Sequence, residues 1–515
     1  MGDSSFIYHP KNHASASPDK PAYVIPEDNV SVSYETLDEQ ANQLAHVFRD
    51  FGIEIGHGIA FLIENRAGFF EICWAAQRAG LHFTPISTHL KAEEIIYIVT
   101  DCQATAFIIS ATYREIAADI KSRLPTGTHL FSLGGAIPGY HEIEPLLSRA
   151  PTTPLDNETA GSSMLYSSGT TGYPKGIRHP LSGEAPDFCP ERRIDFKHRY
   201  QLNSDVVYLS PAPLYHAAPL TFTMAVMAFG GTCVVMKRFD AATALAFIED
   251  FRVTHSQWVP TMFVRLLRLD EATRKRYDLS SHQVAIHAAA PCPIEVKRKM
   301  IAWWGPIVDE FYAGSEGVGT TFITAKEWLE KPGSVGRSVD GPIYILDESG
   351  NELEPHEIGN IYFANAPNFE YHNAPEKTRQ ALNDNGLGTL GDVGYVDEDG
   401  YLYLTDRKAD MIISGGVNIY PQEAENTLLG HPAVLDAAVF GIPDEEFGEV
   451  VKAVVELAEG FTADEKLAEE ILEFCRDRIA TIKCPRSIDF EAKLPRLPNG
   501  KLYKRELKSR YHPNS

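Results

Sequence analysis

Hydrophobic residues recur at two different spacings along the first half of the chain. Short apolar runs, such as Ile59–Ile63 and Phe107–Ile109, have the length and composition of buried strands. They alternate with segments of helical spacing, such as Phe69–Arg78 and Ala92–Val99. Strands that alternate with helices of this length are typical of βαβ units. The pattern therefore predicts an α/β fold built on largely parallel sheets.

Another stretch of the first half of the chain is apolar enough that a membrane span has to be considered. Ala217–Met236 contains no charged residue and is long enough to span a bilayer. However, it holds a proline, three threonines and the pair Gly230-Gly231. A buried helix over about 220–229, a glycine turn and a strand over 232–236 explain these residues better. We therefore expect no integral membrane span.

The pattern is interrupted late in the first half of the chain and changes again in the second half. Leu181–Arg199 carries mixed charges, two prolines and no clear period, so we expect it to be rich in loops. Short β elements over 341–363 predict a small β subdomain. From Tyr401 onward, strands and helices alternate in a compact α+β unit. We place the boundary at the charged segment Thr405–Lys408, which gives a large domain, 1–405, and a small mobile domain, 406–515.

Composition and charge narrow the function classes. The 515 residues carry a net charge of −23, which argues against binding nucleic acid or an anionic membrane. Seven scattered cysteines without C-x-x-C spacing indicate free thiols in a reducing compartment and no zinc site. The first twelve residues lack an apolar core segment, so we expect no signal peptide. Together these features predict a cytoplasmic protein.

The chain has one glycine-rich loop with phosphate-binding chemistry. Tyr166–Gly176 reads Tyr-Ser-Ser-Gly-Thr-Thr-Gly-Tyr-Pro-Lys-Gly. Glycines let successive N–H groups turn toward one anion, and a lysine adds a point charge suited to phosphate. Pro174 stands where the common loop G-x-x-x-x-G-K-[ST] has its second glycine, and it disfavours a helix start at Lys175. A flexible surface turn is the alternative, but the Pro-Lys-Gly ending favours anion binding.

Further motifs follow this loop in a fixed order. They are Pro213–His216, Ala288–Pro291, Tyr312–Glu316, Gly333–Arg337, Gly391-Asp392, Asp406–Asp410, Gly415-Gly416 and Pro495–Lys501. In this order they resemble the adenylate-forming (ANL) superfamily of acyl- and aryl-CoA synthetases, peptide-synthetase adenylation domains and beetle luciferases. The resemblance implies two half-reactions. A carboxylate attacks the α-phosphate of Mg·ATP to give an acyl-adenylate, and a thiol, typically coenzyme A, then displaces AMP.

The resemblance also implies roles for individual residues. The residues expected to hold the β- and γ-phosphates are Ser167, Ser168, Gly169, Thr170, Thr171, Gly172 and Lys175. Those expected around the nucleotide are Ala288, Ala289, Ala290, Pro291, Tyr312, Ala313, Gly314, Ser315, Glu316, Asp392, Arg407 and Lys501. Tyr312 stacks on adenine, and Asp392 with Arg407 binds the ribose. Thr170 and Glu316 serve Mg²⁺, a hard ion that usually keeps several waters.

The same resemblance implies residues for catalysis, thioester formation and acid binding. Lys501 bridges the carboxylate and the α-phosphate, and it is grouped as catalytic with Glu316, Thr170 and His216. Asp406 is the hinge, with Lys408 beside it, and Gly415 and Gly416 line the pantetheine tunnel. The acyl pocket is expected to include Tyr215, His216, Ala217, Ala288, Gly314 and Gly319. Any one of these residues, taken alone, could have a purely structural role. Their joint occurrence in the order of the family favours the functional roles.

The sequence departs from the family pattern at a few positions. Ser315 replaces the usual threonine, Leu390 replaces the threonine often found before Gly-Asp, and the usual upstream aromatic is missing at Leu387-Gly388. Ala288 stands where many relatives have glycine, and Gly314 where many have a larger residue. An acyl pocket of unusual shape is the expectation that follows.

The branch of the family follows from a missing charge. No acidic residue occurs in 215–222, where amino-acid-activating relatives hold the substrate ammonium. A buried ammonium without a counter-charge is costly, so amino-acid substrates are disfavoured. No carrier domain follows Lys501, which favours a stand-alone CoA ligase for a hydrophobic acid: fatty, aryl-propenoic or steroidal. A luciferase-like oxygenase, a ligase that loads a carrier-protein thiol and a non-catalytic nucleotide-binding protein stay open, as does a monomer or a homodimer.

Overall fold

The computed structural model describes residues 7–167, 174–364, 369–407, 410–414, 417–444, 446–496 and 502–511. The chain folds into two compact units. The first comprises Met1–Trp258, Leu269–Ala285 and Asn368–Thr378, and the second comprises Val259–Arg268, Ile286–Pro367 and Arg379–Ser515. The predicted domain boundary at residues 405 and 406 stays a prediction.

A six-stranded sheet in the first unit confirms the predicted parallel arrangement. Its strand order is β7-β6-β5-β3-β4-β8, and every paired neighbour runs parallel. The strands are β3 (Gly58–Leu62), β4 (His82–Pro85), β5 (Ala104–Ser110), β6 (His129–Leu133), β7 (His141–Glu142) and β8 (Ser162–Ser163). The order reverses between β3 and β5, as in other doubly wound sheets.

Helices cover both faces of this sheet. They are α2 (Tyr34–Asp50), α3 (Phe69–Arg78), α4 (Ala92–Asp101), α5 (Arg114–Ile120) and α6 (Ile143–Leu147). Ile95 and Ile98 of α4 share one apolar cluster with Leu62 of β3, whereas Phe61 of β3 meets Phe69 of α3 edge-on at 5.3 Å. Successive strand residues point to opposite faces, so α3 and α4 lie on opposite sides.

A second group of strands in the first unit is ordered β13-β11-β12-β1-β2. These strands are β1 (Pro21–Ile25), β2 (Val30–Ser33), β11 (Val207–Ser210), β12 (Thr232–Val235) and β13 (His255–Trp258). The uncharged stretch forms the largely buried helix α8 (Ala217–Ala228) and strand β12, close to the predicted elements. Within the described ranges, no helix is both long and apolar enough to cross a bilayer.

The arms of the glycine-rich loop belong to a small antiparallel sheet of order β20-β10-β9. Its strands are β9 (Leu165–Ser167), β10 (Lys175–Arg178) and β20 (Glu370–Tyr371). Because β10 begins at Lys175, directly after Pro174, the prediction that no helix starts at this lysine is confirmed.

The expectation of a loop over Leu181–Arg199 is wrong in its second half. Residues Glu191–Arg199 form helix α7. Glu191 lies in the first turn and three basic residues lie in the last turn, which complements the helix dipole. Phe196 anchors the helix, with its ring 4.9 Å from that of Phe222 in α8. A single aromatic contact of this kind leaves no apolar period to detect in the sequence. The other helices of this unit are α1 (Pro10–Ala16), α9 (Ala241–Asp250) and α11 (Glu271–Arg276).

The second unit contains three groups of strands. The first is β15 (Val308–Ala313), β16 (Thr320–Ile323) and β17 (Arg337–Ser338), paired antiparallel in chain order. The second is the predicted small β subdomain, of order β18-β19-β21-β22: β18 (Ile343–Leu346), β19 (Gly359–Phe363), β21 (Asp392–Val396) and β22 (Leu402–Arg407). Because β22 continues to Arg407, the charged segment that marks the predicted boundary is still mostly strand.

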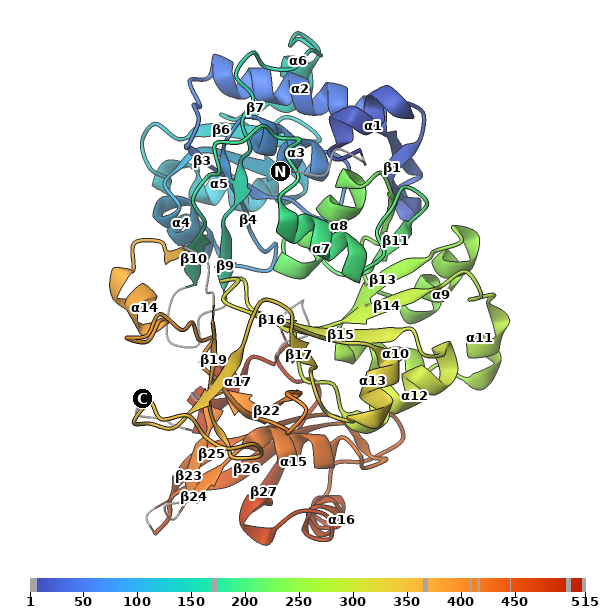
Figure 1. Ribbon diagram of the computed structural model, residues 1–515, viewed down its shortest axis with the longest axis vertical. Coiled ribbons are helices and arrows are strands. Elements are labelled where there is room, and N and C mark those ends of the chain that lie inside the picture. The colour runs from blue at the N-terminus through green and yellow to red at the C-terminus, as the bar shows by residue number, and fades with distance from the viewer. Residues whose placement is uncertain are drawn as a thin grey trace. The chain divides into compact units, whose positions relative to one another are not determined.

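The third group is the five-stranded sheet of the α+β region, of order β24-β23-β26-β25 with β27 on β26 (Figure 1). Its strands are β23 (Ile412–Ser414), β24 (Val417–Ile419), β25 (Val434–Asp444), β26 (Gly448–Leu457) and β27 (Ser487–Glu491). Helices α15 (Pro421–Leu428) and α16 (Glu465–Arg476) share its apolar core, and Pro421 takes the predicted first helical position. The other helices of the second unit are α10 (Pro260–Leu267), α12 (Ile294–Trp304), α13 (Ala325–Glu330) and α17 (Lys504–Tyr511). Helix α14 (Pro375–Gln380) and strand β14 (Val284–His287) each begin in the first unit and end in the second.

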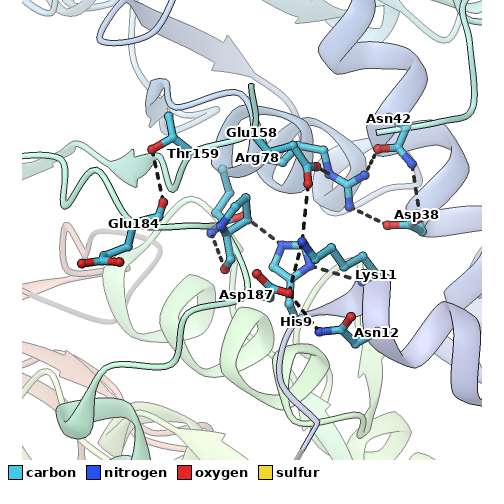
Figure 2. Close-up of polar contacts among 12 residues, drawn as sticks. His9, Lys11, Asn12, Asp38, Asn42, Arg78, Glu158, Thr159, Glu184 and Asp187 are labelled. Carbon is cyan, nitrogen blue, oxygen red and sulfur yellow. Dashed lines mark hydrogen bonds and ion pairs between the residues drawn. The ribbon is translucent and has the colours of Figure 1, made fainter. Parts of the chain in front are cut away.

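A partly buried polar network closes the base of the segment that carries the glycine-rich loop (Figure 2). Residues 158–161 lead into this segment and residues 184–187 lead out. Glu184 O accepts from Ala160 N at 2.8 Å and from Thr159 Oγ1 at 3.2 Å. Lys11 of α1 pairs with Glu158 at 3.4 Å and with Asp187 at 3.2 Å. The two ends of the segment are therefore cross-linked to each other and to α1.

Arg78, the last residue of α3, ties this network to the sheet. Its side chain is fully buried, and its guanidinium donates to Asn42 and, at 2.5 Å, to Asp38 of α2. It also pairs with Glu158 at 3.6 Å. One buried cation therefore faces two carboxylates from different parts of the chain.

Replacing Arg78 should be costly. We expect Arg78→Ala to lower the free energy of unfolding by about 3–5 kcal/mol, because two partly buried carboxylates lose their cation. Denaturant titration of both proteins measures the change. As the matched control, Lys275→Ala removes an exposed pair with Glu271 and should cost less than about 0.5 kcal/mol. Equal stabilities of the two variants would contradict the interpretation.

Candidate active site

The predicted nucleotide motif of the second unit lies at the end of β15. Tyr312 and Ala313 are the last residues of the strand, and they pair with Thr321 and Thr320 of β16. The chain turns between the strands, where Gly317 N donates to Gly314 O at 3.1 Å. Glu316 lies half-buried in this turn. The antiparallel hairpin thus places the tyrosine on a rigid strand and the carboxylate in the turn that follows.

Tyr312 and Asp392 meet although they are far apart in the sequence. The tyrosine hydroxyl donates to Asp392 Oδ2 at 2.5 Å. Asp392 is buried and begins β21, after Gly391 at a φ of 77°. Its backbone pairs with that of Arg407 in β22. The structure therefore brings together the residues predicted to contact the base and the ribose.

The segment after β14 has an unusual backbone. Ala288 is buried, whereas Ala289 is exposed and has a φ of 76°. An alanine in the left-handed region is strained by roughly 1–3 kcal/mol, and such strain is concentrated at functional sites. Ala290 and Pro291 continue the turn toward α12. The peptide groups at 288–290, rather than their small side chains, are the features that this turn presents.

Two glycines predicted for the acyl pocket are closely packed. A Cβ atom at Gly314 would lie 2.3 Å from Leu390 Cδ2 and 2.7 Å from Glu316 Oε2. A Cβ atom at Gly319 would lie 2.2 Å from the ring of Phe363. Neighbouring side chains thus fill the space beside both glycines. Their place in the acyl pocket stays a prediction.

A buried charge cluster under this motif was missed by sequence reasoning. Lys297 Nζ of α12 lies 2.6 Å from Glu310 Oε2 of β15, and His287 Nε2 lies 3.3 Å from the same oxygen. Burial alone would raise the pKa of Glu310, but His287 and Lys297 outweigh it and lower the pKa to about 2. Glu310 stands two residues before Tyr312 and His287 directly before Ala288. The only sequence signal is a lysine on the inward face of an amphipathic helix.

In the first unit, the predicted gate residue His216 is the N-cap of α8. Its Nε2 atom is buried and has no hydrogen-bond partner among the described residues. Burial, with a smaller effect of His89, lowers the pKa of His216 to about 3. Tyr215 lies beside it, with ring centres 4.5 Å apart, and Ala217 begins the helix. The imidazole is therefore neutral near pH 7 and retains a free nitrogen.

Asn65 holds the loop that carries His216, and it too was missed. Its amide nitrogen donates to Ala212 O at 3.1 Å and to Met236 O at 2.8 Å. Its oxygen accepts from Leu214 N at 2.9 Å. An Asn directly after a buried strand is the sequence signal, but its partners lie about 150 residues away.

Lys175, the described cation of the glycine-rich loop, lies over an aromatic ring. Its Nζ atom is 5.0 Å from the centre of the Tyr371 ring in the neighbouring strand β20. Cation–π contacts of this kind hold an ammonium in place without neutralising it. The Tyr371 ring thus helps to fix the position of the Lys175 ammonium.

Several predicted residues lie outside the part of the chain that the structure describes. They are Ser168, Gly169, Thr170, Thr171, Gly172, Lys408, Gly415, Gly416 and Lys501. The side chains of Ser167, Asp406 and Arg407 also lie outside it. Among described residues, no cluster of three or more His, Cys, Asp and Glu side chains is arranged to hold a metal. The roles of all these residues stay predictions.

The low pKa of His216 gives a pH-dependent prediction. Since its folded-state pKa of about 3 lies below the ordinary value of 6.5, protonation favours the unfolded chain. Stability should fall as the pH drops through this window, and His216 in the folded protein should not titrate between pH 8 and 5. Histidine-labelled NMR, with the signal assigned by its loss in His216→Ala, measures this. A midpoint above pH 5 would contradict the assignment.

Comparison with known proteins adds independent findings. Residues 11–370 match the model of a family described as AMP-binding enzyme, and residues 423–501 match that of the AMP-binding enzyme C-terminal domain. The long-chain-fatty-acid–CoA ligase FadD13 of Mycobacterium tuberculosis is 32% identical over 510 residues, covering 97% of each chain. Feruloyl-CoA synthase of an Amycolatopsis species is 31% identical, covering 98% of each.

A solved structure agrees over the same length. ATP-bound MatB from Rhodopseudomonas palustris superposes with a TM-score of 0.82 and 27% identity, covering 96% of both chains. The family match spans well over half of the chain, and the motifs occur in the expected order. The chain therefore belongs to the AMP-binding enzymes, in the acyl- and aryl-CoA synthetase branch of the adenylate-forming superfamily.

Proposed function

We propose that this protein is an ATP-dependent acid–CoA ligase that acts on a hydrophobic carboxylic acid. One observation carries the choice of acid: His216, whose neutral imidazole has no hydrogen-bond partner at Nε2 among the described residues, heads the uncharged, largely buried helix α8. A substrate ammonium beside it would find no counter-charge on this helix. A carboxylate followed by an apolar body fits these surroundings.

The named relatives support the same class. FadD13 is named for long-chain fatty acids, and the Amycolatopsis enzyme is named for ferulate. Both acids join one carboxylate to an apolar body and lack an ammonium. We propose a fatty, an aryl-propenoic or a steroid side-chain acid as the substrate of this chain.

The first half-reaction forms the acyl-adenylate. One carboxylate oxygen of the acid attacks the α-phosphorus of ATP, the bond to the bridging oxygen breaks, and pyrophosphate leaves. Lys501 neutralises charge on the carboxylate and α-phosphate, while Lys175 holds the pyrophosphate end. Tyr312 packs on adenine, and Asp392 binds the ribose hydroxyls. The half-buried carboxylate of Glu316 is a hard oxygen ligand that fits Mg²⁺, which would offset phosphate charge.

The second half-reaction transfers the acyl group. The sulfur of coenzyme A attacks the acyl carbon, the bond to the phosphate oxygen breaks, and AMP leaves with the displaced electron pair. In our proposal the domain 406–515 turns about Asp406 between the two steps, and Gly415-Gly416 lines the path of the thiol. The seven cysteines are all unpaired, which supports a reducing compartment and a cytoplasmic location.

A substrate panel tests the proposal. We expect pyrophosphate release with fatty or aryl-propenoic acids, followed by CoA-dependent release of AMP, because the site accepts apolar acids. Mass measurement of the acyl-adenylate identifies the acid. Activity with acetate or amino acids alone would contradict the proposal. Light and oxygen consumption without CoA would instead indicate an oxygenase, and transfer only to a carrier-protein thiol would change the acceptor.

Lys501 should matter for one half-reaction only. We expect Lys501→Ala to slow adenylation by at least about 100-fold, because charge on the reacting oxygens loses its cation. Thioester formation from supplied acyl-adenylate should change little. Lys493→Ala, which alters an exposed lysine in the same region, is the matched control and should leave both steps intact. Equal loss of both steps in Lys501→Ala would exclude the assigned role.

A further inference from the structure

The carboxylate of Asp101 is hydrogen-bonded to both sides of the sheet that carries Lys175: to one outer strand, β9, and to the turn after the other, β20. Asp101 is the last residue of α4, about 65 residues before β9 in the sequence. Its Oδ2 atom accepts from Tyr166 Oη of β9 at 2.6 Å. Its Oδ1 atom and its backbone carbonyl accept from Asn373 Nδ2, at 3.2 and 3.1 Å. Asn373 is the second residue after β20, and His372 lies between them.

Two chains of contacts, here called arms, lead from Asp101 to β10. The first arm passes through the ring of Tyr166. Tyr166 and Gly176 are paired residues of β9 and β10. A Cβ atom at Gly176 would lie 2.8 Å from Tyr166 Cζ, so the ring rests directly against this glycine. Burial raises the pKa of Tyr166 far above its ordinary value. The phenol therefore stays protonated and donates a hydrogen bond to Asp101. The position of Gly176, and of Lys175 beside it, thus depends on where Asp101 holds this ring.

The second arm acts on β10 from the opposite edge. Asn373 has a φ of 55°, and its side chain fixes the turn that follows β20 to Asp101. In this strand the Tyr371 ring lies under Lys175 Nζ at 5.0 Å, and His372 N donates to Gly176 O at 2.8 Å. The ammonium of Lys175 and the carbonyl of Gly176 are therefore both held by residues that depend on Asn373.

We propose that Asp101 is a positioning residue that sets Lys175 for the pyrophosphate end of ATP. The inference rests on the proposed function for the role of Lys175, but its geometry uses described residues alone. Asp101 does not touch ATP; it acts through Tyr166 on one side of β10 and through Asn373 and Tyr371 on the other. A lysine side chain has four rotatable carbon–carbon bonds, so fixing its strand and the ring beneath it removes much of its freedom.

The network of Figure 2 serves as an internal contrast. Lys11, Arg78, Glu158 and Asp187 hold the base of the same segment, yet none of them contacts Lys175, Gly176 or Tyr371 in the contacts described above. Loss of a base contact should lower stability without moving Lys175. Loss of Asp101 should alter ATP binding beyond its effect on stability.

Equilibrium binding of Mg·ATP and of AMP to the full-length protein, measured by calorimetry, tests the proposal. AMP lacks the pyrophosphate and serves as the matched ligand. We expect Asp101→Ala to raise the Kd for ATP by about tenfold or more, because the loss of this hydrogen-bonded carboxylate leaves Lys175 less well positioned. The Kd for AMP should rise by less than about twofold. Asp187→Asn is the control variant and should leave both Kd values within about twofold of wild type.

A double-mutant cycle separates positioning from a general structural effect. Lys175→Ala alone should also weaken ATP binding, and adding Asp101→Ala should then weaken it little further, because Asp101 acts through Lys175. If Asp101→Ala does not fold, Tyr166→Phe and Asn373→Ala each remove one arm and enter the same comparison. Each should weaken ATP binding while sparing AMP.

The outcomes are distinct. Wild-type ATP affinity in Asp101→Ala, equal loss of ATP and AMP affinity, or an effect that adds fully to that of Lys175→Ala overturns the proposal. A wild-type protein that binds ATP but forms no acyl-adenylate with any acid overturns the proposed function instead. The binding comparison does not require turnover, so the two failures cannot be confused.

Discussion

The buried amide of Asn65 links three connections of the first unit. It lies where β3 ends, and all three of its hydrogen bonds go to backbone groups of the β11 and β12 connections. A side-chain amide has just this mixture of donors and acceptor, and any apolar replacement would leave buried peptide groups unpaired. The loop with His216 begins at this point. The position of His216, the predicted gate residue, thus depends on a hydrogen-bonded amide in another connection of the same unit.

The charges near the candidate site follow a similar rule. Lys297 and Glu310 pair beneath the strand with Tyr312, and Asp101 binds two neutral donors beside the strand with Lys175. Buried ionised groups are tolerated only when paired or fully hydrogen-bonded. Each of these groups therefore fixes the distance between two chain segments. Tyr312 lies two positions after Glu310 on the same strand, and Lys175 lies on the strand that pairs with that of Tyr166.

Local pattern was enough for elements whose apolar face is continuous. The helix Phe69–Arg78 has the predicted ends. Helix α2 begins after Ser33, a residue type that favours helix caps, and its side chain accepts from Thr36 N. Helix α7 was missed because isolated side-chain contacts hold it, such as that of Phe196 with Phe222 and that of Lys197 with Phe229. These tertiary contacts outweigh local preference. Ordered motifs identified Tyr312 and Asp392, but the hydrogen bond between them joins residues 80 positions apart. Asn65, Lys297 and Asp101 could not be predicted for the same reason: an isolated polar residue has no sequence signal for its partner.

The alternation of the two units along the chain has a consequence for synthesis. Six segments alternate between them, so the polypeptide passes from one unit to the other five times. Strand β10 ends at residue 178, whereas its neighbour β20 is synthesised only at residues 370–371. At about 5–20 residues per second, the nascent chain carries β10 with one unpaired edge for roughly 10–40 s. An exposed strand edge is a site for wrong pairing, so the sheet that holds Lys175 is a point where chaperones have time to act.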